Sequence, residues 1–501
     1  IFEVPANRPI ALQPLDKDGN ALALMRSWLT VMPGEVQSCV GCHEANYMTP
    51  ISATAMAARK KPSKITPFRG PIRGYSFVRD VQPILDKYCV GCHDGTNKDR
   101  PVLTRGNPVW KHFTSAYMAL HPFVRRSGPE STQNLLPPSE FKANTSELVQ
   151  MLKKGHHGVE LDDDAWSVLY TWIDLNVPFI GSWKEVRKEI PNNGDVERKK
   201  FLALYANRFD DPDVIDWDPG KQEFVAPKPE KKHPQKEVKA AGFPFDGDAA
   251  KRKVTAVKLP KELVADLGDG QKMRFSLIPA GSFVMGTNDW YFDEGPARAV
   301  KVDKPFYMAT FETTNAQYKV FDKNHNSAYF DRHWKDHVNR GYPANLPEQS
   351  VVRVSWKKAM QFCKWMSEKY GLEVSLPTET QWEWAARAGS DGDFWFGNIG
   401  ADFSAYENLS DFSSKKFAVM GIDPQPIRNP SPQMAFVPAD LDFNDGQLVT
   451  ANVGSYAPSP FNLYDINGNV AEWALNDYTK NIGGEKVEGM KVARGGSWRD
   501  R

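Results

Sequence analysis

The sequence predicts an α+β, loop-rich chain in two dissimilar parts, first mostly helical and then mixed helix and strand. Three observations support this prediction. Two identical Cys-Val-Gly-Cys-His pentapeptides lie in the first hundred residues, and capped amphipathic helix patterns surround the second. Residues 184–255 alternate charge and proline, which favours an extended linker. Residues 256–501 are rich in Trp, Gly and Asn and show only three convincing helix patterns, which are capped by Thr314 with Gln317, by Ser355, and by Thr378 with Gln381.

Size and charge exclude several classes of protein. A chain of 501 residues can hold two or three domains. Its 63 basic and 62 acidic residues give no polyelectrolyte character, so nucleic acid is not an expected partner. No apolar run is long enough to cross a bilayer, and the chain opens with Ile1 without a signal-peptide pattern. We expect a soluble protein whose start has been trimmed.

The first residues are predicted to form strands and turns. Residues 1–5 and 11–15 have strand composition, and the turn-rich residues 16–20 follow. An edge without partner strands is not stable alone. We therefore interpret residues 1–50 as the end of a β domain together with the first pentapeptide.

The pentapeptides predict covalent haem. In C-x-x-C-H the two thiols add to the vinyl groups of one haem, and the histidine is placed as an axial iron ligand. A redox dithiol does not need that histidine, and a four-Cys zinc site would leave both histidines unused at an unusual spacing. We expect two c-type haems and an extracytoplasmic location such as the periplasm, where such haems are attached. The attachment residues are Cys39, Cys42, Cys89 and Cys92.

Residues 51–183 are predicted to form the domain of the second haem. A short helix with an apolar face runs into Cys89, and His93 is its expected iron ligand. A further helix, capped by Asp162, ends before Pro178. Another helix, capped by Asn144 with Glu147, stops at Gly155.

The sixth ligand of the second haem is expected to be His156. It follows a helix end in a glycine-flanked turn, from which it can approach a haem face. His157, His121 and Met151 are weaker candidates, and His156 with His157 could equally be a surface pair. A bis-His haem would transfer electrons rather than bind a substrate.

Tyr47 makes the first site different. It lies four residues after His43, on the same face if the segment is helical. A tyrosinate is a known haem ligand that leaves the opposite face open. Spacing alone favours a packing role for Tyr47.

Several motifs in residues 1–183 resemble the middle and carboxy-terminal di-haem region of the hydrazine synthase α subunit. They are Arg26-Ser27-Trp28, Pro33-Gly34-Glu35, Ser38 to Glu44 with Tyr47, residues 79–85, Leu120-His121-Pro122, Lys154-Gly155-His156 and residues 171–176. The resemblance implies that Tyr47 binds iron as the catalytic residue and that His43 binds zinc. The second haem would transfer electrons. The family's amino-terminal β-propeller is not represented, and no residue pattern identifies ammonium or nitric oxide as substrates.

Residues 256–501 carry six motifs that resemble the formylglycine-generating (sulfatase-modifying factor) family. They begin with residues 278–286 and continue with 312–315, 354–356, 376–384, 467–473 and 494–498. The resemblance implies a loop-rich C-type lectin-like fold and two calcium sites built from oxygen ligands. The ligands it implies are Asn408, Leu409, Asp445 and Gln447 in one site, and Asp465, Gly468, Val470 and Glu472 in the other. Asn467-Gly468 could otherwise be only a turn.

Formylglycine formation is not expected. The family's oxidase uses two copper-binding cysteines, and Asp500 stands where the first would be. A carboxylate does not replace a thiolate at Cu(I). The second would fall beyond Arg501, so we expect an incomplete domain. Cys363, the remaining cysteine, lies on a predicted helix and is interpreted as a buried apolar residue.

The combined prediction is a di-haem cytochrome fused through a linker to a non-catalytic formylglycine-generating-enzyme-like domain. Electrons would reach an open-faced first haem that acts on a small nitrogen or oxygen species. A redox protein and further subunits are the expected partners. One alternative is a pure electron carrier whose first haem is ligated by His43. Another is a sulfatase-modifying-type oxidase with accessory haems.

Overall fold

The chain forms two compact units. The computed structural model describes residues 1–25, 28–37, 59–70, 73–98, 100–106, 113–124, 139, 142–185, 194–211, 214, 217–229, 233–330, 342–413, 419–420, 425–426 and 439–499. The amino-terminal unit comprises Ile1–Arg126, Asn134–Gln150 and Val159–Lys228. The carboxy-terminal unit comprises Ser127–Gln133, Met151–Gly158 and Pro229–Arg501. The boundary after Lys228 falls inside the stretch predicted as linker.

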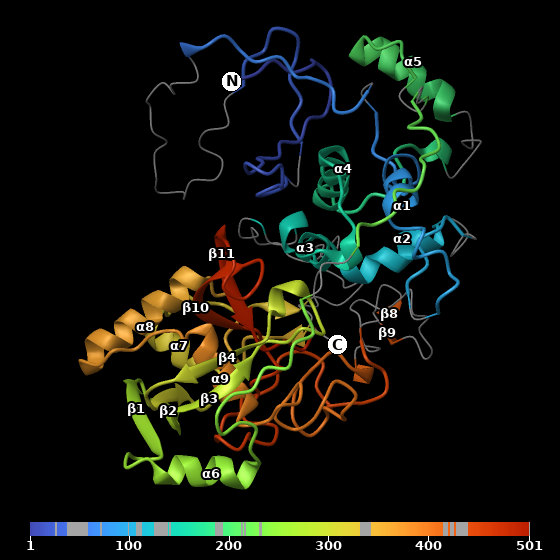
Figure 1. Ribbon diagram of the computed structural model, residues 1–501. Helices are drawn as coiled ribbons and strands as arrows, with labels where there is room; N and C mark the ends of the chain where they lie inside the picture. Colours follow the sequence, from blue (N-terminus) through green and yellow to red (C-terminus); the bar gives the residue numbers. More distant parts are fainter. Residues whose placement is uncertain are drawn as a thin grey trace. The chain divides into compact units, whose positions relative to one another are not determined.

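Helices dominate the described part of the chain up to Ala206 (Figure 1). They are the π-helix η2 (Phe77–Val81), α1 (Gln82–Tyr88), α2 (Ser115–Leu120), the 3-10 turns η3 (His121–Phe123) and η4 (Ala143–Thr145), α3 (Glu147–Lys154), η5 (His156–Gly158), α4 (Asp163–Asp174), η6 (Trp183–Glu185) and α5 (Gly194–Ala206). The described parts of residues 1–37 form isolated β-bridges rather than the predicted strands, for example Ile10 with Leu29. Composition had not predicted α5.

Capping explains where these helices begin. The predicted cap of α4 is confirmed, because Asp162 Oδ1 accepts a hydrogen bond of 2.7 Å from the Ala165 N–H. The predicted Asn144 cap is wrong. Asn144 lies inside η4, and Ser146, which directly precedes α3, accepts the Val149 N–H at 3.4 Å instead. A serine immediately before the first helical residue has the short side chain that an N-cap requires.

An aromatic cluster forms the core of the amino-terminal unit. Phe77 lies 5.1 Å from Tyr117 and 5.2 Å from Trp172, measured between ring centroids. Phe179 lies 4.9 Å from Tyr117. Phe77 and Trp172 are completely buried. These rings join η2, α2 and α4 around one centre.

Asp174, at the end of α4, attaches the first residues of the chain to this core. It is buried, and its two carboxylate oxygens accept the N–H groups of Ala21 at 2.7 Å and Ala143 at 2.8 Å. Burial raises the pKa of Asp174, while the two N–H groups act in the opposite direction. One side chain therefore satisfies two buried backbone donors on distant segments.

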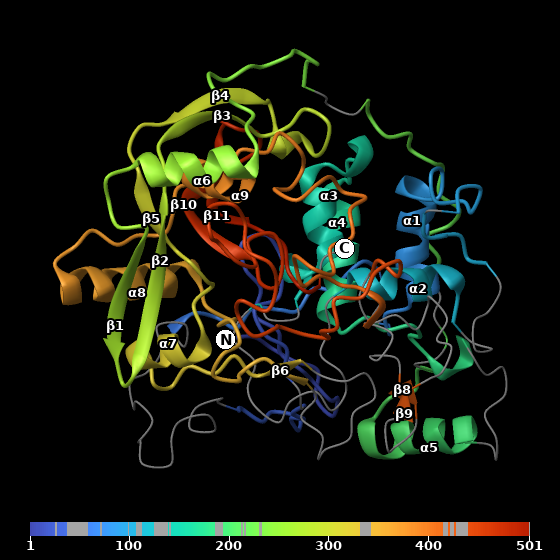
Figure 2. The same cartoon turned by 90° about the horizontal axis from the view of Figure 1, so that it is seen from below.

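The carboxy-terminal unit mixes helices with small antiparallel sheets (Figure 2). Its elements are α6 (Gly247–Ala256), β1 (Glu262–Gly268), β2 (Gln271–Ile278), β3 (Gly281–Met285), the 3-10 turn η8 (Phe292–Glu294), β4 (Arg298–Val302), β5 (Phe306–Ala309), α7 (Asn315–Phe321), β6 (Tyr329–Phe330), β7 (Tyr342–Pro343), α8 (Trp356–Tyr370), α9 (Glu379–Arg387), β8 (Val419–Met420), β9 (Gln425–Pro426), β10 (Glu472–Thr479) and β11 (Lys486–Arg494). Strands β1, β2 and β5 form a three-stranded sheet in that order, and β3–β4 and β10–β11 are hairpins.

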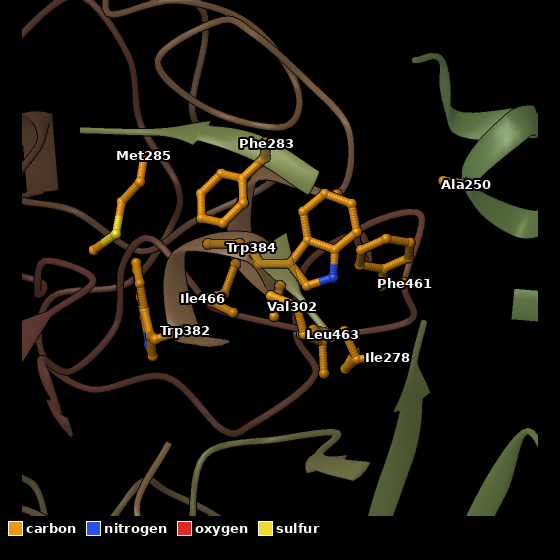
Figure 3. Close-up of a cluster of buried hydrophobic side chains, with 13 residues drawn as sticks. Ala250, Ile278, Phe283, Met285, Val302, Trp382, Trp384, Phe461, Leu463 and Ile466 are labelled. Carbon is orange, nitrogen blue, oxygen red and sulfur yellow. The ribbon is translucent and has the colours of Figure 1, made fainter. Parts of the chain in front are cut away.

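Two hydrophobic clusters stabilise this unit. In one, the buried Trp384 of α9 lies between Phe283 and Phe461, and its indole N–H donates to the Pro279 carbonyl at 2.8 Å (Figure 3). In the other, α7 and α8 pack on β1 and β2 through residues such as Tyr318 and Phe362. Among the described residues, no helix combines the length and the apolar character needed to cross a membrane.

The predicted helix starts of the carboxy-terminal unit are confirmed. Thr314 and Thr378 each form a capping box with the residue three positions later, and Ser355 caps α8. Helix α9 ends at Ala388, whose φ of 45° is left-handed. The structure adds α6 within the predicted linker, capped by Asp246.

Replacing Asp174 by asparagine should loosen the attachment of residues 1–25. An amide group presents only one acceptor oxygen to the two N–H donors, which leaves one buried donor unsatisfied. We expect hydrogen exchange at the Ala21 and Ala143 amides to become about tenfold faster. Exchange mass spectrometry measures this rate. Asp163→Asn, an exposed change on the same helix, is the control, and equal exchange in both variants would contradict the role of Asp174.

Candidate functional site

The second pentapeptide forms a tight turn at the end of α1. The Cys89 carbonyl accepts the N–H groups of Cys92 at 3.1 Å and His93 at 3.0 Å. Cys92 is exposed and Cys89 is half-buried. Burial, followed by the neighbouring Cys92, raises the pKa of the Cys89 thiol to about 12. The turn therefore presents two free thiols and an imidazole from five consecutive residues.

The His93 ring is oriented by the backbone. Its Nδ1 atom lies 2.9 Å from the Pro101 carbonyl oxygen. A carbonyl only accepts, so this contact assigns the proton to Nδ1 and the lone pair to Nε2. Metal-ligating histidines are typically held in this way, by a hydrogen bond from the other ring nitrogen. The Leu103 N–H also donates to the His93 carbonyl at 2.9 Å, which fixes the loop around the histidine.

Asp162 connects the turn to the rest of the unit. Besides capping α4, its Oδ2 atom accepts Tyr88 Oη at 2.7 Å and Lys87 Nζ at 2.9 Å. The Ala165 N–H, together with Lys87 and Tyr88, lowers the pKa of Asp162 to about 2. The end of α1 is thus attached to the start of α4 immediately before Cys89.

The structure describes only some of the other residues that were predicted to bind iron or zinc. Cys39, Cys42, His43 and Tyr47 lie outside the described residues. His156 lies in η5, half-buried, with its ring centroid 4.7 Å from that of His157. Its segment belongs to the carboxy-terminal unit, so the sixth ligand stays a prediction.

The alternatives for the sixth ligand also stay predictions. His121 lies in η3 against Tyr117, with 4.6 Å between the ring centroids, and Met151 is half-buried on α3. Within the described ranges, no three His, Cys, Asp or Glu side chains form a metal-binding group.

The first predicted calcium site is brought together by the fold. The two oxygens of Asp445 accept the N–H groups of Leu409 at 2.9 Å and Gln447 at 2.7 Å. The buried Asn408 Oδ1 atom has no hydrogen-bond partner. Burial raises the pKa of Asp445 to about 7. The sequence had not predicted Asp411, whose carboxylate accepts the Asp445 N–H.

The second predicted calcium site contains more carboxylates than were expected. Asp465 Oδ2 accepts the Gly454 N–H at 2.8 Å, and Asp465 Oδ1 has no hydrogen-bond partner. Glu472 accepts the Trp382 indole N–H at 2.7 Å. The segment Asn467 to Val470 is held by Glu407 and Glu312.

Glu407 and Glu312 are both buried and had not been predicted. Glu407 Oε1 accepts the backbone and side-chain N–H groups of Asn467, each at 3.2 Å, while its Oε2 atom has no partner. Glu312 accepts the Val470 N–H at 2.9 Å. Two sequence signals could have identified them: Glu407 directly precedes Asn408, and Glu312 is the first residue of the 312–315 motif.

We call Glu312, Glu407, Asp465 and Glu472 the carboxylate cluster, and burial is the main influence on their pKa values. Burial, reinforced by the other acids, raises the pKa of Glu407 to about 8 and that of Glu472 to about 7. Asp465 is raised to about 6, also by burial. Calcium prefers carboxylate, amide and carbonyl oxygens, which are the donors present here. No three described His, Cys, Asp or Glu side chains are arranged to hold a metal ion, so calcium binding at these residues stays a prediction.

A separate buried carboxylate, Glu383 of α9, is neutralised by the protein itself. Arg494 Nη2 lies 2.6 Å and Arg387 Nε 2.9 Å from its two oxygens, and the Gly286 N–H donates at 2.8 Å. Burial alone would raise the pKa of Glu383, but Arg494 and Arg387 hold it below its usual range. This contact anchors the motif at residues 494–498, and Asp500 lies outside the described residues.

Cys363 is buried on α8, as predicted. Burial raises the pKa of its thiol to about 11. A protonated, inaccessible thiol is neither a nucleophile nor a metal ligand.

Comparisons with known proteins agree with the two resemblances. Residues 261–501 match the family model of the sulfatase-modifying factor enzyme 1-like domain. Residues 1–44 match that of the hydrazine synthase alpha subunit middle domain. The second match includes Cys39, Cys42 and His43 and stops before Tyr47.

Relatives include active and inactive proteins. The inactive C-alpha-formylglycine-generating enzyme 2 of Bos taurus is 30% identical over 276 residues, which are 47% of this chain and 79% of that protein. The formylglycine-generating enzyme of Mus musculus is 27% identical over 271 residues, 44% of this chain and 65% of that protein. Among solved structures, PvdO from Pseudomonas aeruginosa is 25% identical with a TM-score of 0.35, over 49% of this chain and 89% of that chain.

Changing Asp162 should separate its two roles. Asp162→Ala removes the cap of α4 and should cost about 1 kcal/mol of unfolding free energy, whereas Asp162→Asn keeps a capping oxygen and should cost only a few tenths. Because the pKa of Asp162 is lowered, its contribution is present above about pH 4 and lost as the pH falls towards 2. Urea unfolding of both variants between pH 2 and 5 measures this. Equal losses would contradict the capping role.

The carboxylate cluster predicts that calcium removal makes stability depend on pH. Without metal, the folded state holds protons on these acids more tightly than the unfolded state does, because their pKa values are raised. The free energy of unfolding should therefore fall as the pH rises from about 4 towards 8. Calcium should reverse the trend. Scanning calorimetry at pH 5 and 8, with calcium or a chelator, measures both effects. Glu407→Gln should reduce the pH dependence, and stability indifferent to calcium at pH 8 would contradict the site.

Proposed function

The chain belongs, through its carboxy-terminal half, to the sulfatase-modifying factor enzyme 1-like family, and we propose that this half serves an exported di-haem cytochrome as a binding domain. The observation that carries the proposal is the second pentapeptide turn. Two thiols there accompany an imidazole whose Nδ1 is held by Pro101. That combination suits covalent haem better than a redox dithiol, which has no use for an oriented histidine.

The chain's own residues define what the second site does. Cys89 and Cys92 would hold the haem and His93 would ligate its iron, while Asp162 and Pro101 keep these residues in position. A c-type haem held there supplies one-electron redox chemistry. A haem iron with two protein ligands would serve electron transfer and take no substrate.

The first haem site, at the Cys39–His43 pentapeptide, is proposed as the catalytic site. Its support is the match of residues 1–44 to the hydrazine synthase family, which includes Cys39, Cys42 and His43. By resemblance, Tyr47 would ligate the iron as the catalytic residue and His43 would bind zinc. An iron with one open face could take a small nitrogen or oxygen species. The proposed location is extracytoplasmic, because c-type haems are attached there.

The family domain is proposed to bind a partner protein rather than to act as a formylglycine-generating oxidase. Asp500 occupies the position where the resemblance places the first copper-binding cysteine, and a carboxylate does not suit Cu(I). A relative at 30% identity bears the name of an inactive enzyme. The calcium-ligand residues would stabilise its loops for recognition of a redox protein or another subunit.

Tyr47→Phe tests the proposed function. We expect the oxidised chain to show one low-spin haem and one high-spin, tyrosinate-type haem, with about one zinc ion per chain. The variant should lose the tyrosinate signal and keep the low-spin one. Optical and EPR spectra with zinc analysis provide the measurement, and Tyr205→Phe, at an exposed tyrosine, is the control. Two low-spin haems unaffected by the variant, with no zinc, would instead indicate a pure electron carrier.

A further inference from the structure

Part of the stretch predicted as linker lies against the rest of the amino-terminal unit. We call residues 217–225 the return segment. Its Val225 N–H donates to the Lys87 carbonyl at 2.7 Å. Lys87 is near the end of α1, where carbonyls have no partner within the helix. The return segment therefore satisfies a backbone acceptor next to the Cys89–His93 turn.

Phe224 packs directly on this turn. An ideal Cβ atom built at Gly91 would lie 2.1 Å from Cζ and 2.4 Å from Cε2 of Phe224. Only a residue without a side chain leaves room for the ring at this distance. Phe224 is 43% exposed, so just over half of its surface is covered by the unit. Gly91 thus has a packing reason to be glycine.

Trp217 anchors the other end of the return segment. The Arg73 guanidinium carbon lies 3.8 Å from the Trp217 ring centroid, within the range of a cation–π contact. A Cβ atom at Gly70 would lie 2.8 Å from Trp217 Cδ1. Arg73 also pairs with the buried Asp80 at 2.7 Å. Two aromatic residues, each against a glycine, therefore dock the segment at both ends.

We propose that the return segment is the outer wall of the second haem site, closing the Cys89–His93 turn through Phe224 and Val225. This role rests on the proposed haem attachment. Phe224 and Val225 contact the turn from the return segment, whereas Pro101 contacts it from the loop that follows and Asp162 from the start of α4. Release of Phe224 should let the turn open more often, because local opening is governed by the few contacts that cover a segment.

Alkylation of Cys89 in the full chain, produced without attached haem, tests the contact. Cys89 is half-buried, so opening of the turn should expose its thiol further and speed its modification. We expect Phe224→Ala to raise the alkylation rate of Cys89, followed by mass spectrometry, about five- to thirtyfold. Phe209→Ala, at a side chain 83% exposed on the same stretch, should change nothing. Cys363, buried in the carboxy-terminal unit, reports whether that unit is folded in each variant.

Gly91→Ala provides an independent test that leaves Phe224 in place. Its added methyl group should displace the ring and raise the Cys89 rate like Phe224→Ala. The double variant should react no faster than Phe224→Ala alone, because both changes break one contact. Rates that multiply, or a Phe224→Ala rate equal to that of Phe209→Ala, would overturn the proposal.

The haem-loaded chain separates this proposal from the proposed function. Phe224→Ala should lose the His93 ligation band at a lower denaturant concentration than the wild type, and Phe209→Ala should not. An unchanged midpoint would overturn the proposed wall. A chain that never carries haem on Cys89 and Cys92 would refute the proposed function, while the alkylation rates would still decide whether Phe224 closes the turn.

Discussion

A carboxylate buried without donors or a cation is costly, and both units are organised by the way they meet this constraint. In the amino-terminal unit the protein supplies the partners. The buried Asp80 lies between Arg73 at 2.7 Å and Arg79 at 3.0 Å, and Asp174 receives two backbone N–H groups. These contacts hold the helices that present the pentapeptide turn. The pentapeptide turn is therefore positioned by a polar framework around an aromatic core.

The carboxy-terminal unit meets the same constraint in two ways. Glu383 is neutralised by two arginines, and its contacts join α9 to β11. Around residues 465–472 the acids receive only amide, hydroxyl and indole donors, and oxygens of Glu407 and Asp465 keep no hydrogen-bond partner. The first arrangement is a structural ion-pair network, whereas the second leaves carboxylate oxygens without a hydrogen-bond partner.

The features predictable from sequence are those decided by neighbouring residues. The caps at Asp162, Thr314, Ser355 and Thr378 were predicted because a capping side chain bonds within three residues. The C-x-x-C-H turn is equally local. Asn144 failed because a serine two residues later competes for the same helix start.

Long-range features were not predictable in the same way. Glu312 and Glu407 meet residues 467–470 only through the tertiary fold, and no periodicity signals such contacts. The linker prediction used composition alone. Composition cannot indicate that Trp217 and Phe224 each pack against a distant glycine. The family resemblance supplied the predicted calcium ligands but not Glu312 and Glu407, because a motif describes what relatives share.

The position of Cys363 has a consequence for how the chain matures. Five cysteines are an odd number, and in an oxidising compartment an unmatched thiol can capture a partner and produce scrambled disulfides. Because Cys363 is buried and stays protonated, it is withdrawn from thiol–disulfide exchange once α8 has packed. Among the described cysteines, Cys89 and Cys92 then remain available to oxidants, and they lie in one turn. Early folding of the carboxy-terminal unit would in this way protect the pentapeptide cysteines from cross-linking to Cys363.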